Sequence, residues 1–189
     1  MRRSTPPFVL ALSLVASGLA AQEESRYRLF AGVEPGASYS ESSGLDFEAA
    51  YLLGLDAYFA PRWALEVAAA FQRESFDNGL AAVTVETSNL DAAGRFDMMR
   101  KGSLTLYGLS GLRYSETRDS RRLVRSDGSY LRESGTFDRA GLLLGLGAEL
   151  DVSRRFSLRL AVKHVPWNLT GDSLIFEDTS FSTALAVRF

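Results

Sequence analysis

Residues 51–71 read YLLGLDAYFAPRWALEVAAAF, and this stretch decides how the whole chain folds. Large apolar side chains occupy every second position on both sides of the short segment 60–62, whereas Asp56 and Glu66 fall at positions between them. A period of two is typical of β-strands, because successive side chains of a strand point to opposite faces. The stretch therefore predicts two antiparallel strands joined by a tight turn, with one apolar face and one polar face.

The same alternation continues on both sides of this hairpin. The segments that share it are 27–37, 49–59, 63–73, 88–98, 104–114, 138–150, 156–164 and 179–189. Most of them are close to the roughly 9–11 residues that a tilted strand needs to cross a bilayer. We therefore predict an all-β fold, an eight-stranded antiparallel transmembrane β-barrel whose strands follow one another in an up-and-down meander.

Most charged residues of these segments lie on the face opposite the large apolar residues. Positive and negative charges nearly balance there, as a closed polar interior requires, since an unpaired buried charge is costly. We expect an ion-pair network that plugs the lumen, because eight strands enclose only enough space for side chains. The predicted members of this network are Arg28, Glu34, Asp56, Glu66, Asp91, Arg95, Arg113, Arg139, Glu149, Arg159, Lys163 and Arg188.

Alternation by itself also fits a lipocalin-like soluble barrel, which would hold the apolar set inside. Two patterns favour the membrane barrel. Between its charges the polar face carries mostly Gly, Ala and Ser, which suit a crowded lumen better than a solvated surface. Aromatic residues also fall at strand ends that share one rim, as in the girdle at a bilayer interface. They are Tyr27, Phe59, Trp63, Phe96, Phe156 and Phe189.

The connections between the predicted strands alternate strictly between short and long. Short turns are expected at 60–62, 99–103 and 151–155, and long loops at 38–48, 74–87, 115–137 and 165–178. Alternation places the two kinds at opposite ends of the barrel. This is the layout of an outer-membrane barrel, with short periplasmic turns, long external loops and both termini on the periplasmic side.

Residues 1–21 have the layout of a secretory signal peptide. Met1-Arg2-Arg3 supplies a positive start, residues 8–16 read FVLALSLVA, and small residues allow cleavage after Ala20 or Ala21. We therefore expect a cleaved signal peptide over 1–21 and one outer-membrane barrel domain over 22–189.

The composition excludes several kinds of chemistry. The chain has 189 residues, no Cys, one His and a formal net charge of −2. Without Cys there is no thiolate metal site and no cysteine catalysis, and one His cannot form a multi-histidine site. A slightly acidic chain is also a poor general partner for nucleic acid. We expect no catalytic, metal-binding or cofactor-binding residues, and no cofactor.

The end of the sequence carries the most specific resemblance. Residues 181–189 read FSTALAVRF and residues 106–114 read LYGLSGLRY. With these motifs the chain resembles the small outer-membrane β-barrel domain family of OmpA/OmpX-type and OmpW-like eight-stranded barrels. The resemblance implies that the last strand is the signal for outer-membrane insertion, read by the barrel assembly machinery. The residues of that signal are Phe181, Leu185, Val187 and Phe189.

The longest connection contains five arginines near its predicted hairpin tip at 126–129. They are Arg118, Arg121, Arg122, Arg125 and Arg132. Guanidinium groups bind phosphates bidentately, so these residues are candidates for contacting lipopolysaccharide. The segments beside the tip would then pair and extend their strands above the membrane. The alternative is a solvated loop whose charges compensate one another.

His164 is the remaining candidate for chemistry. Some barrels of the family are lipid A deacylases whose His and Ser lie two positions apart on the lipid-facing side. Here the second position after His164 is Pro166, which has no nucleophile, although Glu177 would supply a carboxylate. We therefore expect no enzyme, and we expect His164 and Trp167 to anchor the barrel at the bilayer edge.

These expectations describe a monomeric integral protein of the outer membrane, exported through the periplasm. Its partners would be outer-membrane lipid, lipopolysaccharide and, during biogenesis, the barrel assembly machinery, with no nucleic acid. The expected role is structural or surface-interacting. Three alternatives stay open: an OmpW-like small-solute channel or carrier, a lipid A-modifying enzyme, and a secreted lipocalin-like binder.

Overall fold

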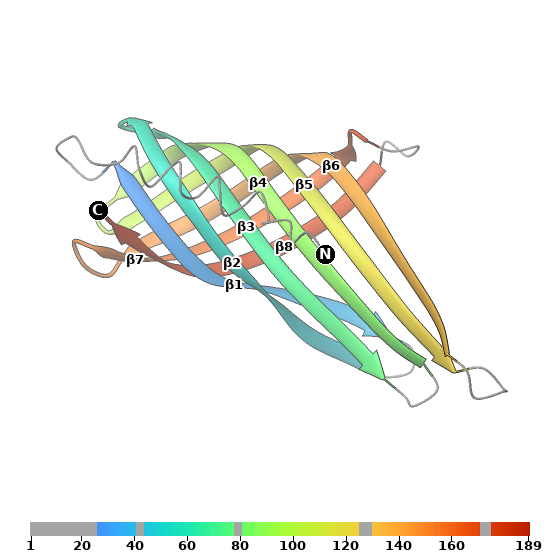
Figure 1. Cartoon of the computed structure of the whole chain (residues 1–189). Helices are drawn as coiled ribbons and strands as arrows, with labels where there is room; N and C mark the ends of the chain where they lie inside the picture. Colours follow the sequence, from blue (N-terminus) through green and yellow to red (C-terminus); the bar gives the residue numbers. More distant parts are fainter. Residues whose placement is uncertain (1–25, 41–43, 78–80, 125–129, 171–174) are drawn as a thin grey trace.

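The computed structural model describes residues 26–40, 44–77, 81–124, 130–170 and 175–189. These residues form eight antiparallel strands that close into a barrel, in which each strand pairs with the next and β8 pairs with β1 (Figure 1). The strands are β1 (Tyr27–Ser40), β2 (Gly44–Ala60), β3 (Trp63–Asp77), β4 (Ala81–Lys101), β5 (Leu104–Val124), β6 (Tyr130–Asp151), β7 (Phe156–Asn168) and β8 (Ile175–Arg188). The predicted up-and-down barrel is confirmed. The signal-peptide prediction over 1–21, the hairpin tip 126–129 and Arg125 lie outside the described residues.

The two faces of the wall separate as the alternation predicts. On β2 and β3, Tyr51 and Leu65 are exposed to the outside, whereas Asp56 and Glu66 are buried inside the barrel. The same contrast recurs on β6, where Leu146 is 62% exposed and Glu149 is fully buried. The barrel therefore has an apolar outer surface around a charged interior, the reverse of a soluble barrel.

Glycine is required inside the barrel where aromatic rings lie against the wall. A Cβ at Gly147 would lie 2.2 Å from Cζ of Tyr107, and a Cβ at Gly54 would lie 2.2 Å from Cζ of Phe30. Both rings are buried. The small residues of the polar face thus provide the space into which these side chains pack.

The seam of the barrel joins the first and last strands. In its register Ala31 lies opposite Leu185, and the backbone N–H of Phe189 donates to the carbonyl of Tyr27 at 3.2 Å. Closure at this seam leaves the described barrel wall without an edge strand facing lipid, which a membrane-spanning sheet requires.

Several strands run farther than the alternation predicts, and this corrects the expected long loops. Segments 74–77, 81–87, 115–124 and 130–137 belong to β3, β4, β5 and β6. The two sides of the longest connection pair, with Leu123 opposite Leu131 and Val124 opposite Tyr130. Beyond the bilayer both faces of a sheet are wetted, so the apolar period fades although the backbone pairing continues.

The barrel wall divides above the closed section. The β2–β3 register ends at Tyr51↔Phe71 and the β6–β7 register at Gly141↔Asn168, while β3 to β6 continue together. We call segments 72–77, 81–89, 115–124 and 130–140 the projecting sheet. Its strands run to the lower right of Figure 1, whereas β7 ends and β8 begins at the upper right.

Candidate functional site: the lumen, the projecting sheet and the outer groove

The lower lumen is organised around the carboxylate of Glu149 on β6. Arg28 Nη1 donates to both of its oxygens at 2.8 and 2.9 Å, and Arg95 Nη2 donates at 2.7 Å. Ser157 adds a hydroxyl at 2.7 Å, and Arg188 lies at 3.3 Å. This one carboxylate therefore connects β1, β4, β7 and β8 to β6.

The middle of the lumen is a second cluster of charges. Asp56 accepts from Arg95 at 2.8 Å and from Arg159 at 3.0 Å, and Arg159 also donates to Glu66 at 2.7 Å. The guanidinium of Arg95 lies 3.8 Å from the ring centroid of Tyr107. The guanidinium of Arg159 likewise lies 4.0 Å from the ring centroid of Phe30. Each of these two arginines therefore has carboxylate partners as well as an aromatic contact.

The upper lumen continues the same pattern. Lys163 lies 3.2 Å from Glu66 and 2.8 Å from Asp91. Arg113 binds both oxygens of Asp91 at 2.7 and 3.0 Å, and its guanidinium lies 3.8 Å from Glu34. One chain of alternating charges therefore runs from Arg28 to Glu34 through the interior.

The structure brings most of the predicted lumen set together. Arg139 differs: it is exposed at the projecting sheet, because β6 has left the closed section there. Asp97 and Tyr107 also enter the network, through Arg95 and Arg159. Both positions have the same inward parity as the predicted set. The sequence therefore already indicates that these two side chains lie in the lumen.

Apolar residues on the inward face complete the plug, although alternation predicts polar residues there. Leu109, Leu143 and Val165 are buried and form a cluster with Tyr107 and Ala93. They interrupt the polar parity on β5, β6 and β7. Alternation alone cannot distinguish a leucine that points inward from a break in the strand pattern. Only the packing in the structure identifies these three residues as part of the plug.

The predicted insertion signal lies on the outer surface of β8. Phe181, Leu185 and Phe189 are exposed there, and Val187 is half-buried on the same face. The segment therefore shows alternate apolar residues to the lipid. Its role in insertion stays a prediction.

The predicted arginine set is divided between the two faces of the projecting sheet. Leu112 and Tyr114 face lipid, so the same parity of β5 places Arg118 and Arg122 on the outward face. Arg132 lies directly opposite Arg122 and shares that face. Arg121 has the opposite parity and forms an ion pair with Asp119 at 3.1 Å.

A row of hydroxyl groups crosses the outward face of the projecting sheet beside these arginines. The register places Ser75 opposite Thr84, Thr84 opposite Ser120, and Ser120 opposite Ser134. The Oγ of Ser75 lies 3.4 Å from the Oγ1 of Thr84. Hydroxyls and guanidinium groups thus lie side by side on a surface that continues upward from the lipid-facing wall.

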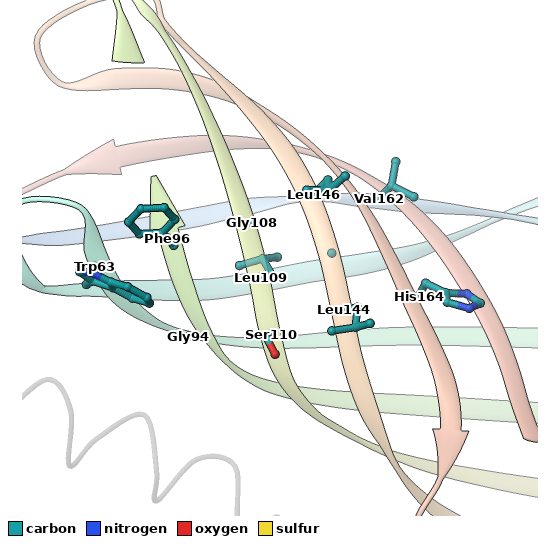
Figure 2. Close-up of a pocket in the computed structure, with 11 residues that line it drawn as sticks. Trp63, Gly94, Phe96, Gly108, Leu109, Ser110, Leu144, Leu146, Val162 and His164 are labelled. Carbon is teal, nitrogen blue, oxygen red and sulfur yellow. The ribbon is translucent and has the colours of Figure 1, made fainter. Parts of the chain in front are cut away.

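The lipid-facing wall contains a groove of about 570 Å³. Gly94, Gly108 and Ser110 line it, and Figure 2 shows Trp63 and Phe96 on one side and His164 on the other. The groove crosses the strands from β3 to β7, with Leu144, Leu146 and Val162 along it. Nδ1 of His164 lies 2.8 Å from the hydroxyl of Thr179.

The described residues contain neither a membrane-spanning helix nor a cluster of metal-ligating side chains. In that part of the chain, no helix has the length and apolar character needed to cross a bilayer. Within the same ranges, we find no group of three or more His, Cys, Asp or Glu residues placed to hold a metal ion.

Comparison with known proteins gives a family and a set of similar folds. The model of the family described as "Outer membrane protein beta-barrel domain" matches residues 8–189. No curated protein matches the sequence.

Solved structures of similar fold come from several bacteria. Ail, the attachment invasion locus protein of Yersinia pestis, was solved with the heparin analogue sucrose octasulfate; it is 16% identical with a TM-score of 0.60, over 88% of this chain and 100% of Ail. Neisserial surface protein A is 13% identical with a TM-score of 0.51, over 86% of this chain and 96% of that one. OprG of Pseudomonas aeruginosa is 15% identical with a TM-score of 0.51, and the match covers 89% of this chain and 98% of OprG. At these identities the likeness shows the fold.

Proposed function

The chain belongs to the outer membrane protein β-barrel domain family, and from this premise we propose that it is a sealed, non-enzymatic barrel that acts through its projecting sheet at the cell surface. A barrel of this family crosses the outer membrane with short turns on the periplasmic side. The short turns here join β2 to β3 and β4 to β5, so the projecting sheet extends from the opposite, external end.

The observation that carries this proposal is the filled lumen. Arg95, Arg113, Glu66 and Glu149 are among its largest fully buried side chains. A solute would have to separate buried ion pairs, and removing one partner of such a pair costs about 3–5 kcal/mol. Transport along the barrel axis is therefore disfavoured, and the surface outside the membrane is left for function.

The outward face of the projecting sheet supports a contact with anionic saccharide. It presents Arg122 and Arg132 side by side, next to the hydroxyl row from Ser75 to Ser134. Guanidinium groups bind phosphate in a forked geometry, and hydroxyls hydrogen-bond sugars. We propose that the ligand is the phosphorylated core saccharide of the surrounding lipopolysaccharide, because this face rises directly from the lipid-facing wall.

Binding of lipopolysaccharide core oligosaccharide, freed of its lipid, tests the surface role. We expect the Arg122→Ser/Arg132→Ser variant in phospholipid nanodiscs to bind it at least ~10-fold more weakly, about 1.4 kcal/mol. Arg121→Ser is the matched control, because Arg121 lies on the opposite face with Asp119. Equal weakening by both variants, or by neither, would remove the outward face as the binding surface.

Planar-bilayer recording tests the sealed lumen and the channel alternative together. We expect no unitary currents from the wild-type barrel. Reproducible currents that change in Arg113→Gln, which alters the Asp91 contact in the upper lumen, would support the channel instead.

The enzyme alternative has a separate test. Lipid A mass spectrometry is compared in cells with the wild-type gene, without the gene and with His164→Ala. We expect one acyl pattern in all three. A pattern that depends on His164 would support lipid A modification.

A further inference from the structure

Two of the three glycines that line the outer groove, Gly94 and Gly108, differ from Gly147 in the lumen in what surrounds them. A Cβ at Gly94 would meet the carbonyl of Ser110 at 3.7 Å, and a Cβ at Gly108 would meet Sδ of Met98 at 3.9 Å. Both are ordinary van der Waals distances. At Gly147 in the lumen, by contrast, a Cβ would lie 2.2 Å from Tyr107. The barrel's own packing therefore does not require glycine at positions 94 and 108.

Glycine at these two positions has a cost. An interior strand glycine is less favourable than alanine, because it loses more conformational freedom on folding. Larger apolar residues such as Leu144 and Leu146 occupy neighbouring positions of the same face. The small residues therefore leave an open groove on the outer surface of the barrel.

The groove has an apolar end and a polar end at different depths. Trp63 begins β3 beside a short periplasmic turn, and its ring centroid lies 4.6 Å from that of Phe96. His164 lies along β7 between Phe156 at the periplasmic end and Trp167 near the external end. The groove thus rises from the periplasmic girdle to the outer leaflet, with its imidazole uppermost.

The imidazole needs a second polar partner. One ring nitrogen of His164 interacts with the hydroxyl of Thr179 at 2.8 Å. The other nitrogen is also a donor or an acceptor, and an unsatisfied polar group in hydrocarbon is costly. An amphiphile whose oxygen lies above its tail matches this arrangement.

We propose that the groove holds one acyl chain of lipid A, the membrane anchor of lipopolysaccharide in the outer leaflet. An ester or hydroxyl oxygen of the chain lies at His164, and the tail descends across Gly94 and Gly108 toward Trp63 and Phe96. A phospholipid of the inner leaflet has its headgroup on the periplasmic side. Its polar atoms would lie at the apolar end of the groove near Trp63, and not at His164. The inference depends on the outer-membrane location alone and is independent of the saccharide contact proposed for the projecting sheet.

Native mass spectrometry of the detergent-solubilised barrel with purified lipid A tests the proposal. Wild type is expected to keep one lipid A, and Gly94→Leu/Gly108→Leu to lose at least ~10-fold in affinity, about 1.4 kcal/mol. The control is Ala31→Leu, an exposed lipid-facing position on β1 outside the groove. Heat-modifiable gel migration confirms that each variant is folded.

Other outcomes overturn the proposal. If the Gly94→Leu/Gly108→Leu variant retains lipid A as well as the wild type does, the groove is not the binding site. Equal binding of phosphatidylethanolamine removes the preference for lipid A. A dimer that forms without lipid and is lost in Gly94→Leu/Gly108→Leu makes a second copy the occupant.

A fluorescence titration keeps the test decisive if the filled variant does not fold. The chain has two tryptophans, so Trp167→Phe leaves Trp63 as the reporter within the groove. Lipid A should change its emission saturably at one lipid per barrel. His164→Ala in this background should weaken that response several-fold while leaving the groove open. A response that is linear in lipid A, or unchanged by His164→Ala, contradicts the proposed site.

Discussion

Arg28 on β1 and Glu149 on β6 are joined across the lumen by two hydrogen bonds of 2.8 and 2.9 Å. Both side chains are buried, and their strands lie on different parts of the wall, since β1 pairs with β2 and β8. The pair therefore braces the barrel in a direction in which backbone hydrogen bonding gives no support.

Glu149→Ala is expected to destabilise the barrel by about 3–5 kcal/mol, because it leaves Arg28 and Arg95 without their shared carboxylate. Urea unfolding in lipid vesicles measures the loss. Glu86→Ala is the matched control, since Glu86 forms an exposed pair with Arg73 at 3.6 Å and should cost less than about 1 kcal/mol. Equal effects of the two substitutions would mean that the lumen network contributes no more than a surface pair.

Gly147→Ala is expected to destabilise the barrel by about 1–3 kcal/mol, because the new methyl group would overlap the ring of Tyr107. Tyr107→Ala removes that ring but leaves a cavity. The double variant should therefore be less destabilised than the sum of the two single changes. If the destabilisation of the double variant equalled the sum of the two single changes, the result would contradict this contact.

Arg132→Glu is expected to stabilise the projecting sheet by about 0.2–1 kcal/mol, because it turns two like charges in register into an opposite pair with Arg122. The same change should abolish binding of the core oligosaccharide. Proteolysis within 115–140 and oligosaccharide titration measure the two effects. Tighter binding by this variant would show that the two guanidinium groups are not the recognition element.

Phe189→Ala is expected to slow assembly into the outer membrane while changing the unfolding free energy of the assembled barrel little. Phe189 is exposed on the lipid-facing surface at the end of β8. The measurement is the rate at which heat-modifiable protein accumulates in cells. Phe156→Ala, at another exposed rim position, is the control and should assemble at the wild-type rate. Equal delay in both variants would indicate a general need for aromatic residues at the rim.

Much of the barrel was readable from the sequence because the bilayer imposes a single rule on each strand. Asp56 and Glu66 are adjacent in the β2–β3 register and buried, as their shared parity indicates. The rule ends where the bilayer ends. Arg121 and Arg122 are neighbours in sequence yet lie on opposite faces of the projecting sheet, and Arg139 has inward parity in a part of β6 that no longer encloses a lumen.

The partners within the lumen were less predictable than its members. Parity places Arg95 inside the barrel, but its contacts with Asp56, Asp97 and Glu149 depend on side-chain length and on the stagger of the strands. The outer groove was likewise missed. Gly94 and Gly108 lie on neighbouring strands, and the β4–β5 register, which places Gly94 opposite Ser110 and Gly108 opposite Phe96, brings them into one hollow.

The seam between β1 and β8 also bears on biosynthesis. Glu149 contacts Arg28 on one side of the seam and Arg188 on the other, and Phe189 hydrogen-bonds to Tyr27. The ribosome makes β8 last, so an interrupted translation product lacks the closing strand. It also lacks the contact between Glu149 and Arg188. The edge of β1 in such a product would expose backbone groups that β8 pairs in the finished barrel.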